Sequence, residues 1–214
     1  MMKKNDKIKM FIDVDGCMLN TLFALASYYN NLNPHANVEP KDIFSWDAKE
    51  VFVGYTTEQI EEIFGTDLFW ENSFPYYKIV DIVKKFHDSG LFDISFCTIG
   101  TSENLVKKTM WLKERFPFIG KQILLVKNNG CYPDKTDINM SSAIFLDDSQ
   151  TNLFTSNAKY KVLCAFDGDK EWNKDWNLDD FRADTVDELY EIVMRIADKE
   201  FTERKIQETI DKCC

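Results

Sequence analysis

The sequence has few of the residues that build zinc sites, tight turns and membrane spans. Its 214 residues include only 2 histidines, and its 6 cysteines show no Cys-X-X-Cys spacing, so a zinc site is not expected. With 8 glycines and 5 prolines, it contains no low-complexity tract or repeat. No segment is apolar over the length that a bilayer requires, and the amino terminus lacks the apolar core of a signal peptide. These absences predict a cytoplasmic globular protein with reduced thiols.

Positive charge is also scarce. The chain has 26 Lys and Arg against 36 Asp and Glu, which gives a net charge of -10. Such an excess repels polyanions, so neither a nucleic-acid polymer nor an anionic membrane is an expected partner. A small phosphorylated substrate remains compatible, because local cations can override the mean field. The length allows one substantial core with a modest insertion, and a homodimer is left open.

What the chain does contain is a short strand that ends in two carboxylates. Apolar residues alternate over residues 8–12, and Asp13-Val14-Asp15-Gly16 follows. Side chains alternate along an extended chain, so Asp13 and Asp15 are expected to point the same way, into the crevice where open α/β sheets bind ligands. Two close anions favour a hard divalent cation such as Mg²⁺. The alternative for Asp15-Gly16 is a hairpin turn.

The rest of the chain alternates between strands and helices, apart from one region. Strands are predicted at residues 92–98, 123–126, 143–146 and 161–165, with helices at 79–88, 102–115 and from 185 onward. This order predicts an α/β fold, a Rossmann-like parallel sheet with helices on both faces. Residues 18–76 differ, because a helix over 18–29 is followed by short aromatic-rich segments. We therefore predict a core of residues 1–17 and 77–214 and a small helical cap at residues 18–76, inserted after the first strand.

Polar residues from three predicted strands are expected to meet at one edge of the sheet. Thr98 ends the second strand, Asp147 and Asp148 follow the fourth, and Lys135 precedes that strand. Together with Asp13 and Asp15, they supply a nucleophile, an acid, a hydroxyl, a cation and an acidic pair, as phosphoryl transfer requires.

Each of these residues also has a structural alternative. Thr98 could cap the helix that begins near residue 102. Asp147 and Asp148 could open a helix as an N-cap and a first-turn acid. Lys127 also follows a strand and competes with Lys135 for the same place.

Taken in order, these segments resemble the four motifs of the haloacid dehalogenase (HAD) superfamily. The resemblance covers about residues 8–165 and rests on Asp13-Val14-Asp15-Gly16, Thr98, Lys135 and Asp147-Asp148. It implies a HAD-like core and a Mg²⁺-dependent phosphomonoesterase. Asp13 would be the nucleophile that forms an aspartyl-phosphate, and Asp15 the general acid and base. Thr98 and Lys135 would bind the phosphoryl oxygens.

The resemblance also implies a set of metal ligands. Asp13, the backbone carbonyl of Asp15, and Asp147 would bind Mg²⁺, with Asp148 in or just behind that shell. A dehalogenase is disfavoured, because it would need neither a metal nor an acid at Asp15.

Within the superfamily, local matches around Thr98, Trp111, Lys135 and Asp147 resemble the 5'(3')-deoxyribonucleotidases. Trp46 falls where that family carries a tryptophan beside the base, and Phe44 is a second pocket candidate, although both could instead fill the cap's own core. The sequence departs from the family pattern at Asn20, Thr21 and Ile99. A nucleoside monophosphate is therefore the expected substrate. A sugar phosphate and a catalytically inactive phosphate-binding module are the alternatives.

Overall fold

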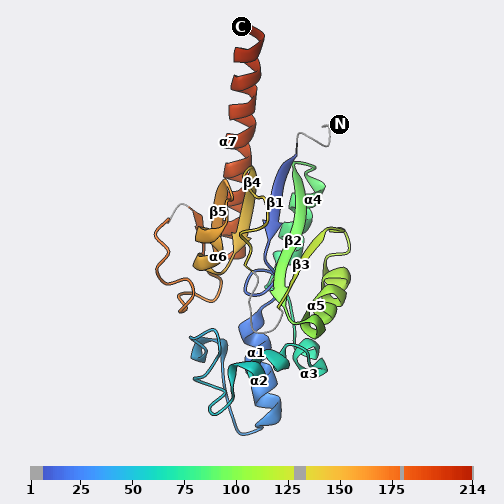
Figure 1. Cartoon of the computed structure of the whole chain (residues 1–214), viewed down its shortest axis with the longest axis vertical. Helices are drawn as coiled ribbons and strands as arrows, with labels where there is room; N and C mark the ends of the chain where they lie inside the picture. Colours follow the sequence, from blue (N-terminus) through green and yellow to red (C-terminus); the bar gives the residue numbers. More distant parts are fainter. Residues whose placement is uncertain (1–6, 128–133, 179–180, 214) are drawn as a thin grey trace.

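The computed structural model describes residues 7–127, 134–178 and 181–213. Its centre is a parallel sheet in the order β3-β2-β1-β4-β5-β6 (Figure 1). The strands are β1 (Ile8–Ile12), β2 (Phe92–Gly100), β3 (Gln122–Val126), β4 (Ala143–Asp147), β5 (Tyr160–Cys164) and β6 (Arg182–Ala183). β1 pairs in parallel with both β2 and β4. This pairing confirms the predicted Rossmann-like sheet and excludes the hairpin at Asp15-Gly16.

Helices cover both faces of the sheet. They are α1 (Thr21–Leu32), the 3-10 helix η2 (Pro40–Asp42), α2 (Thr57–Ile63), α3 (Asp67–Glu71), α4 (Ile79–Asp88), α5 (Ser102–Arg115), α6 (Gln150–Thr155) and α7 (Val186–Cys213). α4 and α7 pack on one face, where Met10 and Ile12 are fully buried. Phe11 points to the other face and packs in the cluster that contains Leu153 of α6. Successive side chains of β1 therefore point to opposite faces of the sheet, and both faces are buried.

Helix caps fix several element boundaries. A capping box opens α2, because Thr56 and Gln59 exchange hydrogen bonds in both directions between side chain and backbone. Thr101, rather than Thr98, caps α5 by accepting from the Asn104 N–H at 3.3 Å. α1 begins later than predicted, at Thr21, because the Asn20 side chain caps it. β6 was not predicted, since two residues are too short for a recognisable alternation.

The segment expected to form the cap leaves and rejoins the core at adjacent points. The Asn20 N–H donates to the Phe74 carbonyl at 3.0 Å, and the Tyr76 N–H donates to the Met18 carbonyl at 3.1 Å. The Trp111 indole of α5 adds a bond to the Ser73 carbonyl at 3.0 Å. Figure 1 shows α1, α2 and α3 beyond the carboxyl ends of the strands. The inserted helices therefore stand over the sheet edge where the candidate residues meet.

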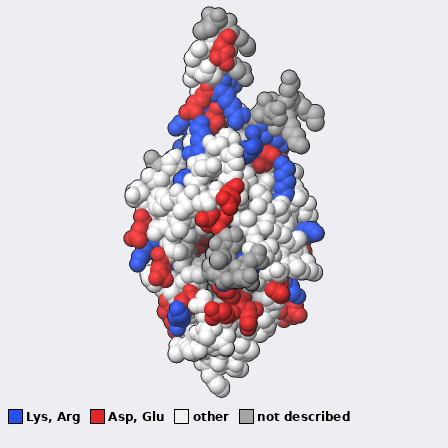
Figure 2. Space-filling view, in the orientation of Figure 1, with Lys and Arg blue, Asp and Glu red and all other residues white. Residues whose placement is uncertain are grey.

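Surface charge is uneven on the face shown in Figure 2. Carboxylates are spread over the lower half, where the sheet meets the inserted helices, whereas most Lys and Arg side chains lie higher, toward α7. The acidic half favours cations over polyanions. Cys17, Cys97 and Cys164 are free and buried, and Cys131 and Cys214 lie outside the described residues. Among the described helices, none combines the length and apolar character of a bilayer span.

Candidate active site

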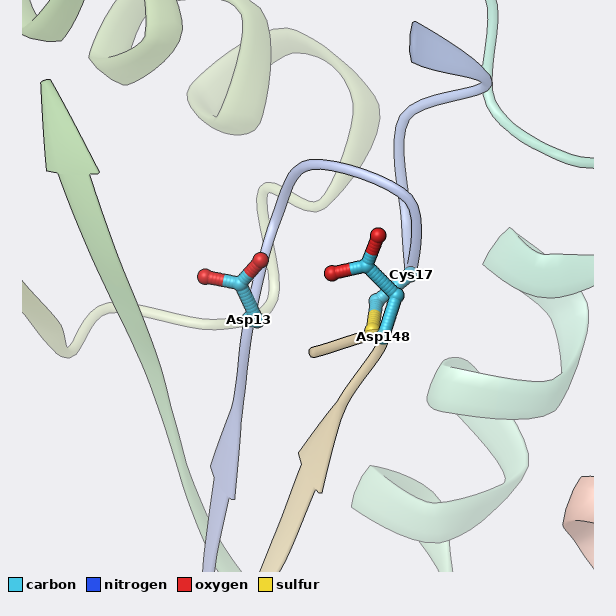
Figure 3. A group of neighbouring side chains, drawn as sticks. All are labelled: Asp13, Cys17 and Asp148. Carbon is cyan, nitrogen blue, oxygen red and sulfur yellow. The ribbon is translucent and has the colours of Figure 1, made fainter. Parts of the chain in front are cut away.

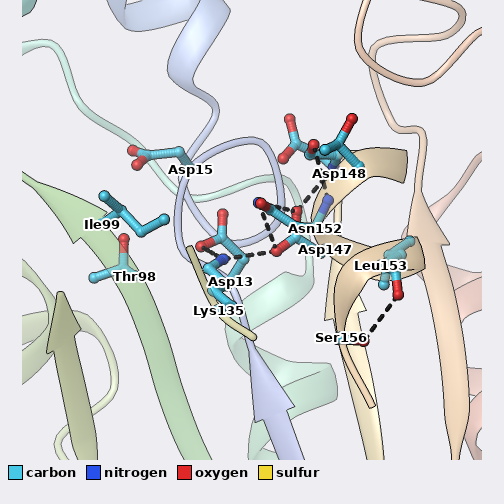
Figure 4. A network of polar contacts seen from close by, with 12 residues as sticks. Asp13, Asp15, Thr98, Ile99, Lys135, Asp147, Asp148, Asn152, Leu153 and Ser156 are labelled. Atoms are coloured by element: carbon cyan, nitrogen blue, oxygen red, sulfur yellow. Dashed lines mark hydrogen bonds and ion pairs between the residues drawn. The ribbon is translucent and has the colours of Figure 1, made fainter. Parts of the chain in front are cut away.

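Asp13 lies at the end of β1, with its side chain between a buried lysine and an open cavity. Its backbone N–H donates to the Leu146 carbonyl at 2.9 Å, which ties it to β4. Lys135 Nζ lies 2.5 Å from Asp13 Oδ1 and 2.6 Å from Asp147 Oδ2, and this lysine is 1% exposed (Figure 4). Lys135 therefore joins the ends of β1 and β4 by a buried ion-pair network.

Asp147 has both carboxylate oxygens occupied by protein donors. Besides Lys135, it accepts from the Ser149 N–H at 2.9 Å and from Asn152 Nδ2 at 3.1 and 3.2 Å. Ser149, not either aspartate, caps α6. Both Asp147 oxygens are thus hydrogen-bonded to protein groups, and one of them holds Lys135. The sequence predicted instead that Asp147 binds the metal, with Asp148 in or just behind that shell.

Asp148 is the carboxylate that shares open space with Asp13. Ligand atoms of Asp13, Cys17 and Asp148 lie within 4.8 Å of one another, and all three residues are buried. Figure 3 shows the Cys17 sulfur set back from the two carboxylates. Burial raises the pKa of the Cys17 thiol well above its usual range, so the sulfur stays protonated and is a poor ligand for a hard ion. In this structure Asp148, rather than Asp147, is the carboxylate that faces Asp13, and the expected metal contact of Asp147 stays a prediction.

The two facing carboxylates suit a divalent cation. Burial, opposed in part by Lys135, raises the pKa of Asp13 to about 7, and burial with the neighbouring Asp147 raises the pKa of Asp148 well above its usual range. A divalent cation would relieve this repulsion, and Mg²⁺ prefers carboxylate oxygens. Asp13 and Asp148 are the side chains that would hold it.

Gly16 allows Asp148 to approach the loop after β1. Its φ is +65°, and a Cβ at this position would lie 2.1 Å from Asp148 Oδ2. On its other side, the same oxygen accepts a hydrogen bond from Trp172 Nε1 at 2.8 Å. The glycine is therefore required by the position of the carboxylate as well as by the turn.

Asp15 is held apart from Asp13 by a second buried lysine. Figure 4 shows the Asp15 carboxylate turned toward the end of β2. Lys108 Nζ lies 2.5 Å from Asp15 Oδ2 and also donates to Thr98 Oγ1 at 2.9 Å and to the Ile99 carbonyl at 3.1 Å. Asp15 Oδ1 is buried and has no hydrogen-bond partner. With its side chain directed away, only the backbone carbonyl of Asp15 could join a metal shared by Asp13 and Asp148.

Lys108 was not predicted as a site residue from the sequence. It lies on the buried face of α5 and is 1% exposed. A lysine three residues after Leu105 and three before Trp111, both of which are buried, is the signal that could have identified it. Its partner Thr98 is fully buried, and the Thr98 hydroxyl accepts a hydrogen bond from Lys108, while its expected contact with phosphate stays a prediction.

The cavity above Asp13 has a volume of about 370 Å³. Asp13, Asp15, Lys135 and Asp148 lie at its base, and its walls include Trp46, Phe64, Ile99, Asn104, Lys127 and Trp172. Lys127 reaches this wall but pairs with Glu61 at 2.6 Å, so Lys135 is the lysine that contacts Asp13.

Of the two aromatic candidates, only Trp46 lines the cavity. Phe44 lies outside the cavity wall and is 45% exposed, with Lys174 Nζ 5.9 Å from its ring centroid. The contact of Phe44 with substrate therefore stays a prediction, and in this structure its ring lies next to this lysine.

The raised pKa of Asp13 predicts that Mg²⁺ binding depends on pH. Below about pH 7 the ion must displace a proton from Asp13, so the affinity should increase as the pH rises through that value. Without the ion, the sign for stability is opposite: burial raises the pKa of Asp13 in the folded state, so the folded state loses stability as the pH rises from the ordinary value of 3.8 to about 7. Calorimetric titrations in buffers of different ionisation enthalpy would count the released proton. A pH-independent affinity without proton release would contradict the assignment.

Gly16→Ala should disturb the position of Asp148. The new methyl group would overlap Asp148 Oδ2, and the positive φ adds strain, so we expect a loss of about 1 kcal/mol or more in unfolding free energy together with weaker Mg²⁺ binding. Gly90→Ala is the matched control, because Gly90 has φ +69° and nothing within 4 Å of the added Cβ. Chemical denaturation measures the stability change. Equal Mg²⁺ affinity in the two variants would show that the contact with Asp148 is unimportant.

Comparison with known proteins identifies the fold. No protein-family model and no curated protein sequence matches the chain. Among solved structures, YfnB from Bacillus subtilis, which is described as a HAD-hydrolase and was solved bound to magnesium, is 13% identical to this chain with a TM-score of 0.56. The match covers 87% of this chain and 98% of that one. A protein from Lactobacillus plantarum assigned as a phosphoglycolate phosphatase is 14% identical with a TM-score of 0.54, over 87% and 99% of the two chains. The chain therefore has the HAD-like α/β fold of these hydrolases.

Proposed function

We propose that the protein is a Mg²⁺-dependent phosphomonoesterase that works through an aspartyl-phosphate on Asp13. The observation that carries this proposal is that Asp13 borders an open cavity and lies between a buried ammonium, Lys135, and a second carboxylate, Asp148. A carboxylate attacking phosphorus meets negative charge, and this arrangement supplies one fixed cation and the ligands for another.

In the first step, an Asp13 carboxylate oxygen forms a bond to phosphorus while the bond from phosphorus to the ester oxygen breaks. The leaving oxygen takes a proton from Asp15, whose buried Oδ1 has no other partner. The products are the free alcohol and the phosphorylated Asp13.

In the second step, Asp15 accepts a proton from a water molecule as the water oxygen bonds to phosphorus. The bond between phosphorus and Asp13 breaks, which releases inorganic phosphate, restores the Asp13 carboxylate and leaves Asp15 protonated for the next cycle. Mg²⁺ held by Asp13 and Asp148 would offset the negative charge of the phosphoryl group in both steps.

Lys108 supports this scheme by fixing Asp15. Its ammonium binds one Asp15 oxygen at 2.5 Å and leaves the other for the leaving group. Thr98 and the Ile99 carbonyl occupy the remaining bonds of the ammonium, so Lys108 has a defined position at the end of β2. It is a positioning residue rather than a phosphate ligand in this scheme.

The proposed substrate is a nucleoside monophosphate. Trp46 and Trp172 form an aromatic wall of the cavity, and Trp46 is 53% exposed, so an indole surface is available to a flat base. The acidic surface in Figure 2 supports a small substrate over a nucleic-acid polymer. The resemblance to deoxyribonucleotidases supports the deoxy form, although the names of the two structural neighbours do not point to a nucleotidase.

Phosphate release tests the function directly. The native chain should hydrolyse deoxynucleoside and ribonucleoside monophosphates with Mg²⁺ and lose activity with chelator, whereas Asp13→Asn should be inactive. Asp15→Asn should lose at least about a hundredfold in rate, because proton transfer contributes that much or more. An equal rate on sugar phosphates would remove the nucleotide assignment. Tight binding of the esters without any phosphate release would show an inactive binding module.

Lys108→Met separates positioning from binding. We expect kcat to fall by about tenfold or more while the Mg²⁺ affinity stays within about twofold, since Lys108 contacts Asp15 and not Asp148. Lys107→Met is the matched control, because Lys107 is the preceding residue of α5 and its side chain pairs with Asp67 at the surface. Steady-state kinetics and calorimetry give both quantities. Unchanged kcat in Lys108→Met would refute the role assigned to this lysine.

A further inference from the structure

We propose that Trp172 is a positioning residue for Asp148 and that the loop carrying it, residues 166–176 after β5, fastens the inserted helices to the metal-binding carboxylate. This inference rests on the proposed function for the presence of a metal at Asp148. It adds a residue and a loop that lie beyond the four sequence motifs.

Trp172 contacts Asp148 directly. Its indole Nε1 donates to Asp148 Oδ2 at 2.8 Å, and one oxygen of Asp148 therefore stays available to an ion shared with Asp13. Gly16 lies against Asp148 Oδ2, the oxygen that accepts from Trp172, on its other side. A hydrogen bond to the outer oxygen of a ligating carboxylate fixes its orientation, and such contacts contribute strongly to metal affinity.

The backbone around Trp172 is anchored beside Asp148. The Gln150 N–H, at the start of α6, donates to the Trp172 carbonyl at 3.0 Å, and the Gln150 side chain accepts from the Asp175 N–H at 3.0 Å. Within the loop, Asn173 is 2% exposed and accepts from the Lys170 N–H at 2.8 Å. The loop is therefore internally bonded and holds the indole in a fixed place.

The opposite side of the loop contacts the inserted segment. Lys170 is 4% exposed, and its ammonium donates to the Ile43 carbonyl at 2.7 Å and the Pro40 carbonyl at 3.2 Å. The Glu171 N–H donates to the Phe44 carbonyl at 3.2 Å. Burying an ammonium group carries a desolvation penalty, which the hydrogen bonds to these two carbonyls offset. Such an arrangement indicates a specific contact between the loop and the inserted segment.

The two tryptophans complete this junction inside the cavity. The rings of Trp46 and Trp172 are 5.5 Å apart with an interplanar angle of 83°, an edge-to-face contact. Trp46 contributes its exposed ring to the substrate wall, whereas Trp172 contributes both a ring and the hydrogen bond to Asp148. Loss of the two indoles should therefore have different consequences.

Calorimetric titration of the full chain with Mg²⁺, without substrate, tests the inference. Trp172→Phe keeps most of the ring but removes the N–H, and we expect its Mg²⁺ affinity to fall about tenfold or more. Trp46→Phe is the matched control, because it removes the partner indole without touching Asp148, and its affinity should stay within about twofold of the native value.

Trp172→Gln distinguishes the hydrogen bond from ring packing. Glutamine keeps an N–H donor and loses the ring, so the inference predicts tighter Mg²⁺ binding in Trp172→Gln than in Trp172→Phe, and packing alone predicts the reverse order. Native affinity in a folded Trp172→Phe would overturn the inference and leave the proposed function intact. Absence of Mg²⁺ binding by the native chain would instead overturn the proposed function and, with it, the inference.

Discussion

Crowding of negative charge at the end of β1 and β4 is the constraint on which the site depends. Asp13, Asp15, Asp147 and Asp148 meet there, and among the described residues the buried ammonium groups of Lys135 and Lys108 pair with them. The raised pKa values of Asp13 and Asp148 indicate that burial and neighbouring carboxylates outweigh the positive charge of the lysines. A folded chain tolerates it only by protonation or by binding a cation, and the buried oxygens of Asp13 and Asp148 favour the cation.

The topology of the sheet explains why these residues meet. β1 lies between β2 and β4, so the parallel strands bring Asp13, the end of β2 and Asp147 to one edge although they are far apart in sequence. The two lysines then divide the aspartates between them. Lys135 ties Asp13 to Asp147, and Lys108 draws Asp15 toward β2. Two carboxylates one residue apart thereby gain different surroundings, which is what separate roles as nucleophile and proton carrier require.

The sequence predicted the backbone framework better than the direction of individual side chains. Apolar alternation, short apolar runs and helical periodicity identified β1, β2, β4 and α5, and strand ends located Asp13 and Asp147, because these signals are local. Which of Asp147 and Asp148 faces the cavity depends on contacts with Asn152, in the helix that follows directly, and with Trp172, in the loop after β5. Neither side-chain contact leaves a periodic trace in the sequence.

Residues in the inserted segment and in the loop after β5 were the hardest to predict. Phe44 and Trp46 are near neighbours of similar chemistry, yet of the two only Trp46 lines the cavity. The backbone beside them is held by the loop after β5, because Lys170 and Glu171 donate to the carbonyls of Ile43 and Phe44. The same loop places Trp172 on Asp148. The proposed substrate wall and the proposed metal-binding carboxylate thus contact the same loop. A displacement of the inserted segment would therefore reach Asp148 through a short series of hydrogen-bonded groups. In this protein, the segment that would select the substrate is physically tied to the carboxylate that would hold the ion.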